Sequence, residues 1–299
     1  MQERKYSLFS LPSHFALLSL RIAYVDVATD SLFASGFVQN NVSVGSELKD
    51  TVKNLVPNAT YYYRVRAGNS GGTSQNSNRV KVKTLTIIVS AKVLLQGPYS
   101  GSGMSTSLNS GGLIPLSQPY NGAPWNYAGT ETVGAIPAGV VDWVIVQLRS
   151  DLTTTVATRA AFIKSDGMVV DVDGVSPVTI PDVSAGNYYI VIRHRNHLAV
   201  MSSSAVPLSG SSELYDFTSG LGKYHGNDAK TLASGVFGMY AADVNGDGSV
   251  IIADELTIIR ANNLRERYDN ADATMDGAVI LADELTLLRK NNLRETKVP

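Results

Sequence analysis

The chain of 299 residues contains no cysteine, few charged residues and no long apolar run. The missing cysteine excludes a disulfide scaffold, a thiol nucleophile and a cysteine-ligated zinc or iron site. Charged residues make up 17 % of the sequence and the net charge is −1, so the composition favours neither nucleic acid nor an anionic membrane as a partner. No stretch approaches the roughly 20 apolar residues of a membrane-spanning helix, and we expect no transmembrane segment.

The N-terminal segment 1–22 has a basic start and a partly apolar middle, which Pro12 and His14 interrupt. It lacks a clear small-residue cleavage site, so it is a poor match to a secretion signal. The alternative interpretation is the accidental start of an incomplete gene, and this is the one we favour. The function of the segment stays uncertain at this point.

Glycine, serine, threonine, asparagine and valine are abundant, and short alternating stretches predict a mainly β protein. The segment 23–86, with the two residues before it, contains four such stretches, "RIAYVDVATD", "GFVQNNVSV", "YYYRVRAGN" and "NRVKVKTL". Leu55, Pro57 and Tyr61 have the spacing of a tyrosine corner, in which the hydroxyl bonds back to the backbone. In this respect the segment resembles the end of a fibronectin type III domain, a β-sandwich. Only about five of its seven strands can be placed, so we expect an incomplete domain and a fragment of a longer protein.

Residues 90–238 predict a second antiparallel β-sandwich. Stretches such as "VVDWVIVQLRS", "TRAAFIKSDG" and "GNYYIVIRHR" read as strands separated by turn sequences. The phrases "GPY", "PLSQPYN", "APWNY" and "RHRNHLAVMS" resemble a module near the C-terminus of large secreted bacterial surface proteins. That resemblance implies a secreted or cell-surface location in bacteria and no particular reaction.

Residues 240–299 contain an acidic loop that occurs twice, "DVNGDGSVIIAD" and "DATMDGAVILAD". Calcium takes six to eight oxygen ligands, which a 12-residue loop supplies from positions 1, 3, 5, 7, 9 and 12, with glycine at position 6. Like charges at such short spacing repel one another unless a cation lies among them. The predicted ligands are Asp243, Asn245, Asp247, the Ser249 carbonyl and Asp254 in the first loop, and Asp272, Thr274, Asp276, the Ala278 carbonyl and Asp283 in the second.

Each loop leads into a stretch with helical spacing, "ADELTIIRANNLRE" at 253–266 and "ADELTLLRKNNLRE" at 282–295. Two such loops, each followed by a helix, resemble a dockerin. The resemblance implies calcium as cofactor and a cohesin-like partner protein that contacts Ile252, Ala253, Leu281 and Ala282. The alternative for Ile252 and Leu281 is packing against the neighbouring sandwich. Because Thr274 replaces a stronger ligand at position 3, the second loop is expected to bind calcium more weakly.

Three further groups are candidates for chemistry. His194 and His197 suggest a metal pair, but no additional ligand stands nearby in the sequence, and a structural or surface role at the tip of a hairpin is favoured. Tyr120, Trp125 and Tyr127 suit stacking on a sugar, although the same residues suit the end of a sandwich. The carboxylates of "VVDVDG" (Asp171 and Asp173) are a glycosidase candidate with a simple turn explanation.

The sequence therefore predicts two antiparallel β-sandwich domains, the first incomplete and fibronectin type III-like, followed by a small helical dockerin-like module. The predicted function is non-catalytic, namely docking or adhesion by a calcium-stabilised secreted or surface protein. The alternative function is a carbohydrate-binding accessory module of a polysaccharide-degrading protein whose catalytic domain lies upstream.

Overall fold

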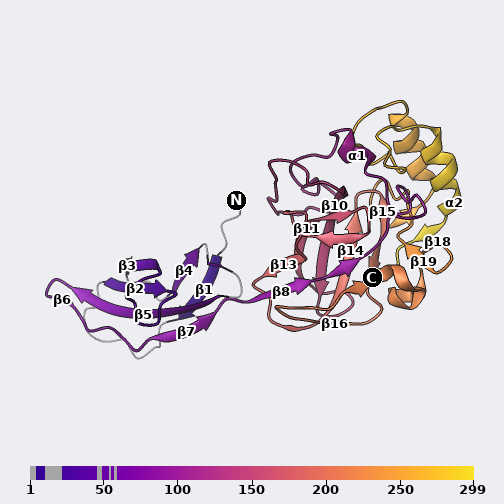
Figure 1. The fold of residues 1–299 in the computed structure, drawn as a ribbon. Helices are drawn as coiled ribbons and strands as arrows, with labels where there is room; N and C mark the ends of the chain where they lie inside the picture. The colour runs from indigo at the N-terminus through magenta and orange to yellow at the C-terminus, as the bar shows by residue number, and fades with distance from the viewer. Residues whose placement is uncertain (1–4, 11–21, 46–48, 54, 57–58) are drawn as a thin grey trace. The chain divides into compact units, whose positions relative to one another are not determined.

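The computed structural model describes residues 5–10, 22–45, 49–53, 55–56 and 59–299, and the rest of the predicted segment 1–22 lies outside them. The chain divides into two compact units, Gln2–Thr86 and Ile87–Pro299 (Figure 1). Both are built mainly from strands, so the predicted mainly β class is confirmed. No helix in the described part of the chain has the length and apolar character needed to cross a membrane.

The N-terminal unit holds two small sheets. Its strands are β1 (Lys5–Ser10), β2 (Ile22–Ala28), β3 (Phe37–Gly45), β4 (Lys49–Lys53), β5 (Thr60–Asn69), β6 (Gly72–Thr73) and β7 (Val80–Lys83). One sheet has the order β3-β2-β5 with β6 and β7 both on β5, and β1 pairs antiparallel with β4 in the other. Strand β1 lies in a region where the sequence suggested none, because "KYSLFS" lacks the turn signals that mark the other strands.

The core of the N-terminal unit is small. Within the described residues, its main cluster of buried apolar side chains consists of Val25, Val27, Val52, Leu55 and Tyr61. The hydroxyl of Tyr61 accepts a 2.8 Å hydrogen bond from the Val56 amide, which is the bond that a tyrosine corner requires. Pro57, the remaining residue of that prediction, lies outside the described residues.

The C-terminal unit is organised around one curled sheet of eight strands, in the order β15-β14-β10-β11-β12-β9-β17, with β16 on β14. Its strands are β9 (Ala91–Lys92), β10 (Val140–Arg149), β11 (Thr155–Lys164), β12 (Met168–Val170), β14 (Gly186–His194), β15 (His197–Met201), β16 (Val206–Leu208) and β17 (Tyr215–Asp216). The pairs are antiparallel except β9 with β17, which is parallel. A separate ribbon joins β8 (Thr86–Val89) to β13 (Val178–Pro181).

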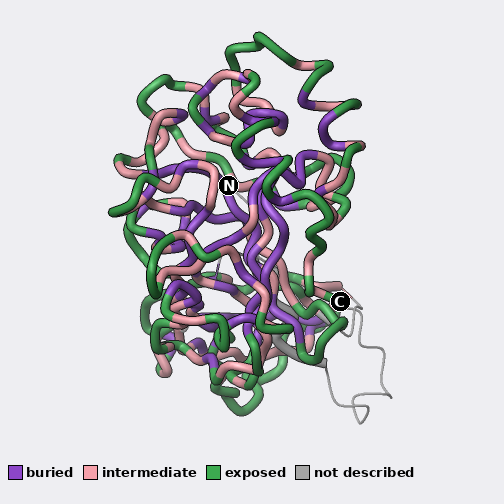
Figure 2. Tube along the Cα trace, turned by 90° about the vertical axis from the view of Figure 1, so that its right-hand side faces the viewer, coloured by how far each residue is buried: buried purple, intermediate pink, exposed green. Residues whose placement is uncertain are grey.

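The buried positions gather in the central strands of this sheet (Figure 2). Trp143 on β10 packs on Phe162 of β11, with ring centroids 4.0 Å apart, at the centre of the core. Strand β10 is paired on both sides and reads as an almost continuous apolar run, as buried strands do. A long connection, residues 97–139, carries the short helix α1 (Ser107–Ser110) and contributes Leu108, Ile114 and Tyr120 to the core.

The repeats at the C-terminal end form short helical segments. These are η5 (Asp254–Ile259) and η6 (Arg260–Asn262) in the first repeat, and η7 (Asp283–Leu288) and α2 (Arg289–Asn291) in the second. The remaining elements are η2 (Phe217–Ser219), η3 (Leu221–Lys223), η4 (His225–Asn227), β18 (Lys230–Ala233), β19 (Val236–Gly238), β20 (Ser249–Val250) and β21 (Arg294–Glu295). The repeats lie beside the β15 edge of the sheet (Figure 1), where the Leu198 amide donates to the Tyr240 carbonyl. They therefore belong to the same compact unit as the sheet.

Both helices end earlier than predicted. Asn263 and Asn292 leave the helical conformation, and the next residue, Leu264 or Leu293, takes a positive φ of 66° or 65°. Within these helices Ile259 and Leu288 are buried, whereas Leu256 and Leu285 are exposed.

Candidate functional site

The first acidic loop is held in shape by its own carboxylates. Asp254, the last residue of the loop, accepts hydrogen bonds from the amides of Val244 and Ile251 at 3.1 and 2.9 Å. Asp243 accepts from the amide of Gly248 at 3.2 Å, which folds the loop back on its first residue. Gly248 has a φ of 90°, a conformation that residues with a Cβ rarely adopt, and this explains the glycine at position 6.

The second loop repeats these bonds. Asp283 accepts from the amides of Thr274 and Ile280 at 2.8 and 2.7 Å, and Asp272 accepts from the amide of Gly277 at 2.9 Å. Thr274, at position 3 of this loop, donates its hydroxyl to the Asp272 carboxylate at 3.1 Å, a hydrogen bond within the loop. The predicted position-12 residues thus close their loops in the same way.

Burial and like charge raise the pKa of the loop carboxylates. Burial is the larger cause for Asp243, followed by the charges of Asp254 and Asp247, and the pKa rises to about 7. Burial raises the pKa of Asp272 to about 6, and the nearby Arg195 cation holds it down. Both shifts express the cost of placing ionised carboxylates in a low-dielectric site without a counter-charge.

Calcium suits this donor set. The groups that would hold it are the carboxylates, the Asn245 or Thr274 oxygen and the carbonyls of Ser249 and Ala278, all of which are hard oxygen donors. Within the described residues, no three side chains of His, Cys, Asp or Glu stand close enough together to form a metal centre. The match therefore rests on donor chemistry and on the raised pKa of Asp243, and a bound cation would supply the missing positive charge.

The two loops are completed by each other's repeat. The short strand β20 in the first loop pairs antiparallel with β21, which follows the second helix. In the second loop Ala278 pairs with Glu266, which follows the first helix. Two further hydrogen bonds join the repeats in the same way. The Leu293 amide donates to the Val250 carbonyl at 2.8 Å, and the Leu264 amide donates to the Val279 carbonyl at 2.7 Å.

A set of ion pairs joins the helices and follows the same symmetry. Arg260 contacts Glu255 of its own repeat and Glu284 of the other, and Arg289 contacts Glu284 and, at 3.7 Å, Glu255. Both glutamates are buried and both arginines are half exposed. Within each repeat the glutamate and the arginine are five residues apart, a spacing that does not predict an ion pair on a helix. The only indication in the sequence is that both residues recur 29 positions later.

The hairpin β14–β15 reaches from the sheet into the repeats. Asn196 at its tip donates to the carbonyls of Asn270 and Asp272 at 3.1 and 2.7 Å, and the Arg195 guanidinium donates to the Asp269 carbonyl. Both residues are buried. The hairpin tip was predicted correctly, but it fixes the second repeat to the sheet and is not a surface feature.

His194 and His197 have structural partners in this hairpin. Their Nδ1 atoms are 3.0 Å apart, His194 Nε2 lies 3.2 Å from Asp142, and His197 Nε2 accepts from the Gly97 amide at 3.1 Å. Although burial opposes it, the charge of Arg195 and the hydrogen bond from His194 hold the pKa of Asp142 at about 2. Burial lowers the pKa of both histidines, so they are neutral and serve as hydrogen-bonding groups. The favoured structural role agrees with these contacts.

Comparison with known proteins adds little to this geometry. No known protein family and no curated protein matches the chain. Two solved structures resemble it weakly: an N-terminal and a C-terminal interface mutant of the type II cohesin–X–dockerin complex from Acetivibrio cellulolyticus. They are 15 % and 16 % identical, with TM-scores of 0.32 and 0.36, and each match covers 71 % of this chain and 97 % of the other. A likeness this weak carries no conclusion about the present chain.

The four predicted partner-contact residues lie at the start of the helices. Ile252 and Leu281 are 57 % and 60 % exposed, so their alternative role of packing against the sandwich is wrong. Ala253 and Ala282 beside them are half buried. Four more apolar side chains are exposed in the same repeats, namely Leu256, Leu264, Leu285 and Leu293. These leucines belong to the stretches with helical spacing at 253–266 and 282–295.

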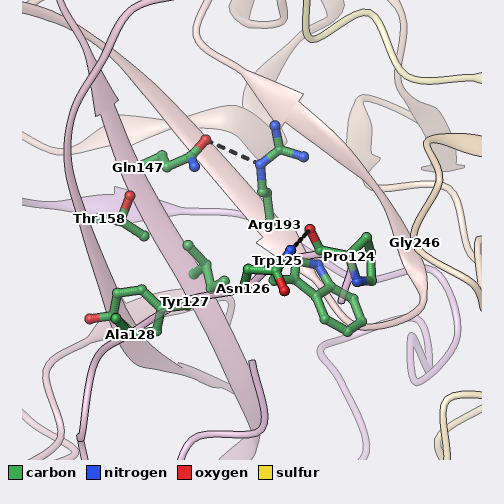
Figure 3. Close-up of a pocket in the computed structure, with 10 residues that line it drawn as sticks. Pro124, Trp125, Asn126, Tyr127, Ala128, Gln147, Thr158, Arg193 and Gly246 are labelled. Carbon is green, nitrogen blue, oxygen red and sulfur yellow. Dashed lines mark hydrogen bonds between the residues drawn. The ribbon is translucent and has the colours of Figure 1, made fainter. Parts of the chain in front are cut away.

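The aromatic residues of the long connection separate into two groups. Tyr120 is fully buried and donates to the Trp143 carbonyl at 2.7 Å, so it caps the sheet. Trp125 and Tyr127 are partly exposed and line a cavity of about 330 Å³ on the sheet (Figure 3). Of the other candidates, Asp171 pairs with Arg159 at 2.6 Å and Asp173 accepts turn amides, so both carboxylates are explained by structure.

Proposed function

We propose that the chain is a non-catalytic docking protein, secreted or displayed on a bacterial surface, whose repeats bind calcium and present an apolar face to a cohesin-like surface protein. One observation carries the proposal. Six exposed apolar side chains form three pairs related by the 29-residue repeat: Ile252 and Leu281, Leu256 and Leu285, Leu264 and Leu293. Exposed apolar side chains gathered on one module are typical of interaction sites.

The backbone at Leu264 and Leu293 supports the same proposal. Both leucines are about as exposed as a side chain can be, at 79 % and 80 %, and both take a left-handed conformation. That conformation costs a residue with a Cβ about 1–2 kcal/mol; the amide bonds to Val279 and Val250 hold the backbone, while the exposed side chains add little packing of their own. Strain of this kind gathers at functional positions, so a bound partner gives these leucines a reason to be there.

Calcium has a structural part in the proposal. The ion would neutralise the carboxylates of each loop, and the exchange of β20 and β21 would transmit that order to the other repeat. The N-terminal unit is proposed to be a fibronectin type III-like spacer. The pairing of β1 with β4 and the bond from the Val56 amide to Tyr61 support this assignment.

The test is calcium-dependent capture of a defined partner. Immobilised full-length chain is exposed to solubilised cell envelope in calcium and in chelator, and captured proteins are identified, produced alone and titrated by calorimetry. Ile252→Asp with Leu281→Asp should abolish binding of that purified partner while the melting curve stays unchanged. Thr231→Asp, on a β18 position outside the repeats, is the control and should bind normally. Equal binding by all variants, or a partner bound equally well in chelator, would contradict the proposal.

A further inference from the structure

The cavity lined by Trp125 and Tyr127 contains the Arg193 cation, whose charge is only partly compensated. Arg193 donates from Nε to Gln147 at 3.1 Å, and within the described residues no ion pair or other hydrogen bond engages its two terminal nitrogens. In Figure 3 the guanidinium stands beside Gln147, with Pro124 and Trp125 along one wall and Thr158 across the cavity. Burial and the nearby Arg149 cation lower the pKa of Arg193, and the charge of Asp243 opposes them.

The floor of the cavity is the middle of the sheet. Ile145 and Gln147 lie on β10, Arg193 is the cross-strand neighbour of Ile145 on β14, and Thr158 is the neighbour of Gln147 on β11. Strand β10 has both edges paired, so no free strand edge is available for an extended peptide to join. A ligand here must be compact and must bind through side chains.

The polar groups around the cavity are numerous for its size. Gln147, Thr158 and Asn126 can donate to or accept from hydroxyl groups, and the partly exposed ring of Trp125 offers an apolar wall. Small-ligand sites combine such a wall with a few placed polar groups in a cavity of at least about 300 Å³. A sugar ring has both an apolar C–H face and a rim of hydroxyls, and a carboxylate is the planar anion that a guanidinium fork fits best.

We propose that this cavity binds one uronic acid unit of an anionic polysaccharide, with its carboxylate on Arg193 and its ring against Trp125. This goes beyond docking by the repeats and does not depend on it. The fourth wall comes from Gly246 in the first acidic loop. A Cβ on Gly246 would lie 2.7 Å from Pro124 Cγ and 3.0 Å from Trp125 Cζ2, so the loop closes tightly on the cavity.

Tryptophan fluorescence gives a direct test. The chain has two tryptophans, and Trp143 is fully buried, so a change on adding sugar reports on Trp125. Full-length protein in saturating calcium is titrated with galacturonic acid and its dimer, and with the methyl ester, which keeps the ring and removes the charge. We expect the acid to bind at least tenfold more tightly than the ester. Equal binding of acid and ester, or no binding of either, would overturn the proposal.

Variants locate the site. Arg193→Gln should weaken acid binding at least tenfold and make acid and ester equal, and Arg193→Lys should recover only part of the loss because it lacks the fork. Trp125→Ala and Gly246→Ala should weaken both ligands. Arg265→Gln, which removes an exposed charge elsewhere, is the matched control and should bind as the unchanged protein does. Unchanged acid selectivity in Arg193→Gln would contradict the assignment.

Two competitors separate the sugar from other anions. Inorganic phosphate and a short aspartate-containing peptide are added at the same concentration as the acid, and calorimetry measures displacement. We expect neither to displace the dimer at equal concentration. If phosphate displaces it equally well, the cavity is a general anion site and the sugar assignment is wrong; equal displacement by the peptide would move the assignment to an acidic protein segment.

Discussion

The two acidic repeats agree at eleven of fourteen positions in their helical halves, 253–266 and 282–295, yet they meet different surroundings. The first loop faces the aromatic connection, where Gly246 approaches Pro124 and Trp125. The second loop is fixed by the hairpin tip, through Asn196 and Arg195. Near-identical sequence thus gives the same local fold, whereas the neighbouring sheet decides how firmly each loop is held and what charge it experiences.

The charge difference bears directly on calcium. Arg195 lies close enough to Asp272 to lower its pKa, whereas burial and the charges of Asp254 and Asp247 raise the pKa of Asp243. A cation in the second loop would therefore meet a buried positive neighbour. This adds a structural reason to the one given by Thr274 for a weaker second site.

Removing the contacts between the β14–β15 hairpin and the second repeat should lower the free energy of unfolding more than any other change. Arg195→Met removes the partner of the fully buried Asp142 carboxylate and should lower the free energy of unfolding by about 3–5 kcal/mol. Urea unfolding followed by tryptophan fluorescence measures this, because both tryptophans lie in the C-terminal unit. Arg267→Met is the control: the Arg267 side chain is half exposed, so solvent screens its ion pair with Asp269, which should be worth about 1 kcal/mol. Equal losses in the two variants would contradict this account.

Removing calcium should cause the second-largest loss of stability. A ligand at one hundred times its dissociation constant stabilises by about 2.7 kcal/mol per site, and chelator should remove that amount. Asp243→Ala should lower the calcium-dependent part of the melting temperature more than Asp272→Ala, because the first loop has the fuller ligand set. Calorimetry in millimolar calcium and in chelator measures both. Superimposable melting curves for the unchanged protein would exclude calcium as a stabilising ligand.

Acidification should weaken the same hairpin. His194 and His197 have folded-state pKa values below the ordinary 6.5, so below that pH the unfolded chain binds protons that the folded chain does not. Their stabilising effect is complete above about pH 6.5 and falls by up to about 1.4 kcal/mol per pH unit for each histidine. The groups facing them, Asp142 and Arg195, keep their charges in this range.

The difference between the protein and its His197→Gln variant isolates this effect from the acidic loops. Urea unfolding at pH 7.5, 6.5 and 5.5 in saturating calcium should show a gap that changes by about 1 kcal/mol as the pH falls. If the difference in the free energy of unfolding between the two proteins stays constant with pH, His197 has the same pKa in the folded and unfolded chains. That result would contradict the prediction.

The smallest effect should come from the strained leucines. Leu264→Asn and Leu293→Asn place a residue that tolerates the left-handed conformation at exposed positions, and each should raise stability by about 0.5–1 kcal/mol. The same variants should weaken capture of the proposed partner. Thermal melting and calorimetry with that partner measure the two effects, and a stability loss in either variant would contradict the interpretation of strain.

The sequence predicted what depends on short-range pattern. The strands around Trp143, the glycine turns of both loops and the Tyr61 hydrogen bond all follow from local spacing. It did not predict the helix ends, because Leu264 and Leu293 are ordinary helix formers forced out of the helix by pairing with the other repeat. It also placed a boundary at about residue 239, whereas Asn291 donates to Gln96 and to the Ala241 carbonyl and so joins the repeats to the sheet. Contacts across such distances leave no periodic signal.

The exchange of β20 and β21 has a consequence for how the chain acquires its structure during synthesis. The first loop cannot complete its pairing until Arg294 and Glu295 have left the ribosome or the export channel, because these residues form its partner strand. A chain that emerges N-terminus first therefore exposes its first set of acidic side chains without this partner strand until residues 294 and 295 have emerged. The second loop pairs with Glu266, which precedes it, so the second loop can be complete before the first.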